Sequence, residues 1–99
     1  MAAFRFSHRA EADLLGIAKY TLRTWGKAQT ARYLRDLEVF CQTLADNPSL
    51  GRPCDIVRSG LRRMEHGKHV VFYRQDRTSI LISRILHQSM LPEKHDTGD

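Results

Sequence analysis

Histidine and arginine side chains gather in the last third of the chain, where they could support acid–base chemistry on a phosphate. Imidazoles change charge near neutral pH and serve as general acids and bases. Guanidinium groups bind phosphate oxygens in pairs. These residue types would suit the cleavage of RNA. The acid–base candidates are His8, His66, His69, His87 and His95, the phosphate-binding candidates are Arg62, Arg63 and Arg84, and Tyr73 could orient a nucleophile.

The spacing of these candidates argues against one compact catalytic group. Side chains alternate between the two faces of a strand, so Arg84 should share a face with Ile80, Ile82 and Leu86, opposite His87. Arg84 on that apolar face is either a structural hydrogen-bond hub or a partner-binding residue, and His87 is either a backbone-bonded strand end or a docking residue. Paired carboxylates and a glycine-rich phosphate loop are both missing. We therefore assign no catalytic residue.

The two cysteines, Cys41 and Cys54, have no CxxC spacing and no histidine at ligand spacing. We expect no metal and no cofactor. The chain has neither a secretory signal nor an apolar run of transmembrane length. These features predict a protein of the reducing cytoplasm.

Two helices should precede the histidine- and arginine-rich segment. Apolar residues at helical spacing predict a helix over about 8–25, with Ser7 as its N-cap, and a second over about 27–46. Gly26 separates the two helices, which must therefore turn back on each other as a hairpin. Gly16 lowers helix propensity, and close packing against a neighbouring element is its expected role.

Short β-branched segments predict the strands. One covers Phe4–Phe6, and three more cover about 61–66, 69–75 and 79–87, joined by turns short enough for hairpins. The order β-α-α-β-β-β predicts an α+β fold in which the helical hairpin packs on a small antiparallel sheet. We expect one domain over residues 1–99, with about 92–99 as a polar tail.

The charge distribution points to an acidic partner. Residues 56–91 carry seven basic and two acidic side chains, a net charge of +5, and twelve of the chain's sixteen basic residues are arginine. Nucleic acid and an acidic protein segment both fit, as does a generally basic surface without a specific partner. The apolar stripes of the helices also exceed one core face, which suggests contact with a partner helix or strand. The surplus residues are Tyr20, Tyr33, Leu37 and Phe40.

The order of several motifs resembles that of the ParE toxins in the RelE/ParE superfamily, over residues 4–96. Single motifs such as Trp-Gly or Asn-Pro occur in many proteins. The combined order of the motifs, with the sequence at the end of the last strand, is specific to this family. The motifs are Ser7 with Ala12-Asp13-Leu14 and Ile17, then Tyr20, Trp25-Gly26, Ala31 and Tyr33, then Asn47-Pro48, Gly51-Arg52-Pro53 and Arg58-Ser59-Gly60-Leu61-Arg62, and finally His69-Val70-Val71-Phe72-Tyr73-Arg74 and Arg84-Ile85-Leu86-His87-Gln88-Ser89-Met90.

The resemblance implies the toxin of a bacterial type II toxin–antitoxin system. Such a toxin inhibits DNA gyrase without being an enzyme, and the acidic C-terminal segment of a ParD-type antitoxin neutralises it in a hetero-oligomer. RelE relatives instead cut mRNA in the ribosome, usually with a terminal aromatic residue or histidine, and this chain has no Tyr after its last strand. Two departures are His8, where many relatives have Pro, and Leu91, where Asp is common.

The resemblance and the residue pattern together give the expected binding sites. We expect His87, Gln88 and Met90 to bind the target. The residues expected to bind the antitoxin are Leu14, Ile17, Tyr20, Leu34, Leu37, Arg62, Arg63, Arg74 and Arg84. Neither a membrane nor specific nucleic-acid binding is expected. Two alternatives stay open, a ribosome-dependent mRNA interferase and a homologue that binds antitoxin without being toxic.

Overall fold

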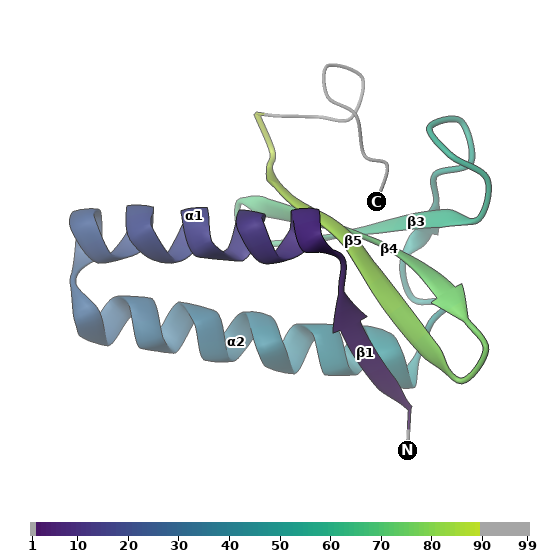
Figure 1. The fold of residues 1–99 in the computed structure, drawn as a ribbon, viewed down its shortest axis with the longest axis horizontal. Helices are drawn as coiled ribbons and strands as arrows, with labels where there is room; N and C mark the ends of the chain where they lie inside the picture. The colour runs from purple at the N-terminus through teal and green to yellow at the C-terminus, as the bar shows by residue number, and fades with distance from the viewer. Residues whose placement is uncertain (1, 90–99) are drawn as a thin grey trace.

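The computed structural model describes residues 2–89 and contains two helices and a five-stranded sheet (Figure 1). The predicted α+β class is confirmed. Within residues 2–89, no helix combines the length and apolar character needed to cross a membrane. The elements are β1 (Ala3–Phe6), α1 (His8–Trp25), α2 (Lys27–Asp46), β2 (Arg52–Pro53), β3 (Leu61–His66), β4 (His69–Asp76) and β5 (Ser79–His87).

Local sequence signals set the ends of both helices. The Ser7 side chain accepts a hydrogen bond from the Ala10 N–H and so caps α1. Gly26 has φ 89°, a conformation that favours glycine, and its N–H donates to the Leu22 carbonyl oxygen. Asn47 ends α2, with its N–H bonded to the Thr43 carbonyl oxygen. The predicted helical hairpin is confirmed.

We had expected a purely antiparallel sheet, but the sheet is mixed. Its strand order is β1-β5-β4-β3-β2, and β1 runs parallel to β5. The whole hairpin separates β1 from the other strands along the chain, so no tight turn dictates its direction. The sequence prediction also missed β2, because Arg52–Pro53 lies in a loop rich in Pro and Gly and pairs only with Arg62 and Arg63.

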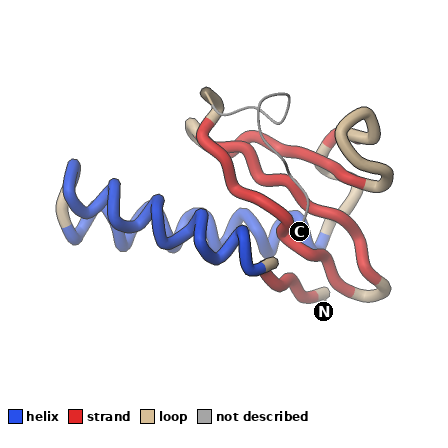
Figure 2. Tube along the Cα trace, turned by 45° about the horizontal axis from the view of Figure 1, so that its top comes forward, coloured by secondary structure: helices blue, strands red, loops and turns tan. Residues whose placement is uncertain are grey.

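The two helices cover one face of the sheet and enclose the main core. In Figures 1 and 2 the end of the hairpin at Gly26 extends well beyond the strands. A smaller apolar cluster lies on the opposite face under Cys54 and Val57. The buried residues of the main core are Ala10, Ile17, Leu37, Cys41, Leu44, Ala45, Val71, Tyr73, Ile80, Ile82 and Ile85.

A bulge in β5 changes the predicted faces of that strand. Tyr73 pairs with Ile82 whereas Phe72 pairs with Arg84, so Ser83 is an extra residue. The prediction that Ile80, Ile82, Arg84 and Leu86 share one face is therefore wrong. Beyond the bulge, Ile85 joins the core beneath the helices, and Leu86 joins the cluster on the opposite face.

Tyr73 fixes the loop between α2 and β3 through its hydroxyl group. The hydroxyl donates to the Pro48 carbonyl oxygen and accepts from the Gly51 N–H, both at 2.8 Å. A Cβ atom on residue 51 would lie 2.9 Å from the Arg63 carbonyl oxygen and closer still to the Tyr73 ring. Glycine is therefore required at position 51 by close approach of the backbone and the ring.

Tyr73→Phe should destabilise the fold by about 2 kcal/mol, because two polar groups of the loop lose their partner. Urea unfolding followed by circular dichroism measures this change. Tyr20→Phe is the matched control, since the Tyr20 side chain is exposed and makes no hydrogen bond within residues 2–89. Equal stability of the Tyr73→Phe variant and the wild type would contradict the assigned role.

Candidate binding surfaces on the helical hairpin and the end of β5

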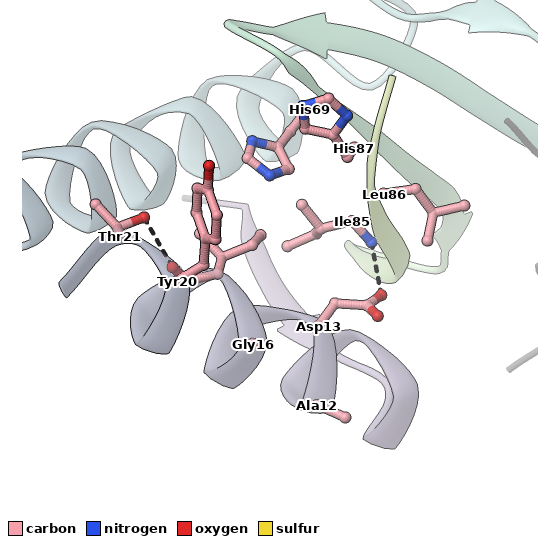
Figure 3. Close-up of a pocket in the computed structure, with 10 residues that line it drawn as sticks. Ala12, Asp13, Gly16, Tyr20, Thr21, His69, Ile85, Leu86 and His87 are labelled. Carbon is pink, nitrogen blue, oxygen red and sulfur yellow. Dashed lines mark hydrogen bonds between the residues drawn. The ribbon is translucent and has the colours of Figure 1, made fainter. Parts of the chain in front are cut away.

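Two grooves flank α1. The first lies between α1 and the end of β5 and encloses about 490 Å³ (Figure 3). The second lies between α1 and α2 and encloses about 600 Å³. The first is lined by Ala12, Asp13, Gly16, Ile17, Tyr20, Thr21, His69, Ile85, Leu86 and His87. The second is lined by Phe6, Glu11, Leu14, Leu15, Ala18, Leu34, Arg35, Leu37 and Glu38.

Asp13 joins α1 to β5 at one end of the first groove. Its carboxylate accepts two hydrogen bonds from the Arg84 guanidinium, at 2.8 and 2.9 Å, and a third from the Ile85 N–H at 2.9 Å. Only 13% of each charged side chain is exposed. Arg84 is therefore a structural hydrogen-bond hub, one of the two roles that the sequence suggested, and its role in antitoxin binding stays a prediction.

The start of α1 also protects the open edge of β5. Pairing between β1 and β5 stops at Phe6 and Ile82. Beyond that point the Ser7 N–H donates to the Ile82 carbonyl oxygen, and the Ser7 hydroxyl donates to the Ser83 carbonyl oxygen. Together with Asp13, these bonds satisfy backbone groups that an unpaired strand would leave open. The end of β5 is thereby fixed to α1.

Gly16 opens the first groove rather than packing against a neighbour, which corrects the sequence prediction. A Cβ atom built at this position has no heavy atom within 4 Å. Gly16→Ala should therefore stabilise the protein by about 1 kcal/mol through helix propensity. Thermal unfolding at fixed pH measures the change. A lower melting temperature would contradict an open groove at Gly16.

Three histidines from three adjacent strands form one row, and two of them, His69 and His87, line the first groove. His66 pairs with His69, which in turn pairs with His87. The Tyr33 hydroxyl of α2 contacts Nδ1 of His69, and Phe40 stacks on His66 with the ring centroids 4.6 Å apart. Burial, followed by the nearby His87 and His66, lowers the pKa of His69 from its ordinary value.

The apolar residues expected to bind antitoxin do not form one surface. Leu14 and Leu34 line the second groove, whereas Tyr20 lines the first. Ile17 and Leu37 are 9% and 1% exposed and belong to the core. These two positions cannot supply much contact area, because the sheet already buries them.

The free end of the hairpin carries a basic surface that the sequence analysis missed. Residues 14–35 contain five basic side chains and no acidic one, so their net charge of +5 equals that of the whole chain. Four of the exposed large hydrophobic side chains lie on the same segment, namely Leu15, Tyr20, Leu22 and Trp25. Counting charge by halves of the chain concealed this segment, because acidic residues flank it.

Most arginines expected on the sheet contact this chain's own groups. Arg62 donates to the Gly51 carbonyl oxygen. Arg63 lies over the Phe72 ring and pairs with Glu65 at 3.5 Å. Arg74 is half-buried at the register of Leu61 and Leu81. The predicted arginine set therefore does not form one basic face.

Two of the residues predicted to bind the target, His87 and Gln88, lie where β5 ends. His87 lines the first groove, and its Nδ1 accepts from the Ser89 N–H at 3.2 Å. Gln88 has an exposed side chain, and its N–H donates to the Lys68 carbonyl oxygen. Met90 lies outside the described residues. The arginine and histidine candidates do not converge on one point, and the arrangement favours a binding surface over an acid–base site.

Comparison with known proteins identifies the family. The profile described as "ParE toxin of type II toxin-antitoxin system, parDE" matches residues 4–92. The chain is 42% identical to Toxin ParE1 of Caulobacter vibrioides over 95 residues, covering 96% of this chain and 98% of that protein. It is 39% identical to Toxin ParE1 of Mycobacterium tuberculosis over 88 residues, covering 88% and 90% of the two chains.

A solved structure has the same fold. The structure titled "Chromosomal ParDE TA system from P. aeruginosa" superposes with a TM-score of 0.72, at 23% identity, covering 88% of this chain and 96% of that one. At this identity the structural match supports the fold alone, and the sequence matches show the family. The chain belongs to the ParE toxin family of type II toxin–antitoxin systems.

Proposed function

We propose that this ParE-family toxin inhibits DNA gyrase and that an acidic ParD-type antitoxin neutralises it. The observation that carries the proposal is the family match over residues 4–92. In this proposal the antitoxin binds the helical hairpin and gyrase binds the end of β5. On this assignment the protein acts by binding and not by chemistry.

The free end of the hairpin and the second groove have the character that an acidic, amphipathic antitoxin segment requires. Leu14, Leu15 and Leu34 provide apolar contacts in this groove, which Glu11, Arg35 and Glu38 also line. Residues 14–35, which include the free end of the hairpin, carry a net charge of +5. An apolar groove of this kind accepts alternate apolar side chains of a partner helix. Cations beside the groove would attract its carboxylates and speed its approach.

The antitoxin half of the proposal predicts that the toxin will copurify with a small acidic protein encoded beside it. Affinity purification of the toxin from cells expressing the neighbouring reading frame, followed by mass spectrometry, measures this association. A stable toxin that is produced alone at high yield without harm to the cells would contradict the proposal. It would favour a homologue without toxicity.

The end of β5 is the proposed contact with gyrase. Asp13 and Ser7 fix the strand, and the chain then leaves the sheet at the exposed Gln88. A rigid strand that presents an exposed segment loses little conformational entropy when a partner binds it. His87, Gln88 and Met90 keep their proposed role in target binding.

Deletion of residues 88–99 should abolish inhibition of gyrase supercoiling. Deletion of only residues 92–99 is the matched control and should leave inhibition intact, because it removes the polar tail and keeps the proposed docking segment. Both variants are checked by circular dichroism. Full inhibition by a folded chain that ends at His87 would refute the assignment of the target site.

The mRNA interferase alternative finds less support in the geometry. Arg84 is bonded to Asp13, and Arg62 is bonded to the Gly51 carbonyl oxygen. Both guanidinium groups already bind groups of this chain, which leaves them less available to hold a phosphate beside the imidazoles.

A further inference from the structure

The three histidines and Tyr33 form a cluster of which the proposed function uses only His87. His66, His69 and His87 stand at one register across β3, β4 and β5, and the rings of His69 and His87 meet edge to face with centroids 5.6 Å apart. The centroid of the Tyr33 ring lies 5.6 Å from that of His69 and 6.0 Å from that of His66. In Figure 3 the two imidazoles of His69 and His87 lie next to each other above Ile85.

We propose that the three-histidine row and Tyr33 form an acid-sensitive latch that holds the end of β5, including Gln88 and Ser89, against the start of β4. The latch favours neutral imidazoles, because charged rings in this half-buried row would repel each other. Nδ1 of His87 accepts from the Ser89 N–H at 3.2 Å and also contacts the Ser89 hydroxyl at 2.9 Å. Nδ1 of His69 can accept from the Tyr33 hydroxyl only while that nitrogen carries no proton.

The phenol of Tyr33 is well suited to the donor role. Burial raises the pKa of Tyr33, so its hydroxyl keeps its proton throughout the neutral range. Protonation of His69 would turn Nδ1 from an acceptor into a donor and would reverse this bond. A proton on Nδ1 of His87 would exclude the Ser89 N–H and leave only the Ser89 hydroxyl as the partner of that nitrogen.

The surroundings of the row offer little to compensate a positive charge. Tyr20 and Asp13 of α1 line the same groove, and the Asp13 carboxylate is already bonded to Arg84. Tyr33 faces the row from α2, and His66 and His87 face His69 from the strands on either side. Lys68 in the connecting turn is exposed and basic. Two or three adjacent imidazolium groups would repel each other at this half-buried site.

The direction of the pH dependence follows from His69. Its folded-state pKa lies below the ordinary value of 6.5, because burial and the two neighbouring imidazoles disfavour the charged form. The stabilisation of the latch by neutral His69 is complete above pH 6.5. It is lost as the pH falls through the lowered folded-state pKa of His69. Acid should therefore release the end of β5, which is the segment that the proposed function assigns to gyrase.

Amide hydrogen exchange on the full chain without any partner tests the latch. The Gln88 N–H donates to the Lys68 carbonyl oxygen across the latch. Its protection factor should fall roughly tenfold between pH 7.5 and pH 5.5 as the latch opens. The double variant His69→Gln/His87→Gln has no imidazole at either position. Its Gln88 protection factor should be equal at both pH values, whatever its absolute size. His8→Gln is the matched control, because His8 is fully exposed on α1, and it should behave like the wild type.

Two results would overturn the proposal. One is wild-type protection of Gln88 that does not change between the two pH values. The other is the same fall in the double variant as in the wild type, which would assign the pH dependence to other groups. Because no gyrase or antitoxin is present, the latch can fail while the proposed function stands, and the reverse also holds.

Discussion

Replacing Asp13 with Asn should destabilise the protein by about 3 kcal/mol, a large share of the stability of a domain of this size. The substitution removes the negative charge between α1 and β5 and leaves the Arg84 guanidinium, 13% exposed, without its carboxylate. It also weakens the bond that holds the Ile85 N–H at the open edge of β5. Urea unfolding followed by circular dichroism measures the loss.

A control and a double-mutant cycle make this prediction specific. Asp36→Asn removes an exposed carboxylate of α2 and should leave the unfolding midpoint unchanged. Asp13→Ala combined with Arg84→Ala should cost clearly less than the sum of the two single substitutions, because the pair acts as one unit. Additive costs would show that Asp13 and Arg84 do not depend on each other in the folded state.

Leu15→Glu should weaken antitoxin binding about 100-fold, or about 2.7 kcal/mol, without unfolding the toxin. Leu15 is 57% exposed and lines the second groove together with Glu11 and Glu38. The substitution removes an apolar contact and adds a carboxylate where an acidic partner would approach, so loss of contact and like-charge repulsion act together. Isothermal titration with the purified antitoxin measures the affinity.

Val39→Glu is the matched control for Leu15→Glu. Val39 is 61% exposed on α2 and lines neither groove. The same change of an apolar residue to a carboxylate should leave the affinity within about threefold of the wild type. Equal weakening by both variants would show that net charge controls binding, and would remove the second groove from the proposed antitoxin site.

The helices could be predicted closely because their signals are local. Ser7 caps α1, Gly26 reverses the chain, and Asn47 before Pro48 ends α2. Each of these signals acts within a few residues, so no knowledge of the tertiary fold is needed. The strands β3 and β5 also began and ended as predicted, because short turns join them to β4.

The register of β5 could not be predicted because one residue changes it. The hairpin turn pairs Asp76 with Ser79, and without the bulge His69 would face Leu86. The extra residue Ser83 places His87 opposite His69 instead. The sequence showed all three histidines, but their single row depends on that bulge.

Ion pairs between residues far apart in the sequence also determine which charged side chains remain available to a partner. Asp13 and Arg84 are separated by 71 residues, and nothing local links them. The basic end of the hairpin could have been found from the sequence, since residues 14–35 contain no acidic residue. That signal emerges only when charge is counted by structural element rather than by half of the chain.

A gyrase supercoiling assay and a cell-free translation assay, run on the same preparation of toxin, test the central claim most directly. The account predicts that the toxin stops supercoiling, that translation and its mRNA stay intact, and that the antitoxin restores supercoiling. Cleaved mRNA with normal supercoiling would contradict the account and establish the interferase alternative. Normal activity in both assays would contradict it as well and would leave a homologue that only binds antitoxin.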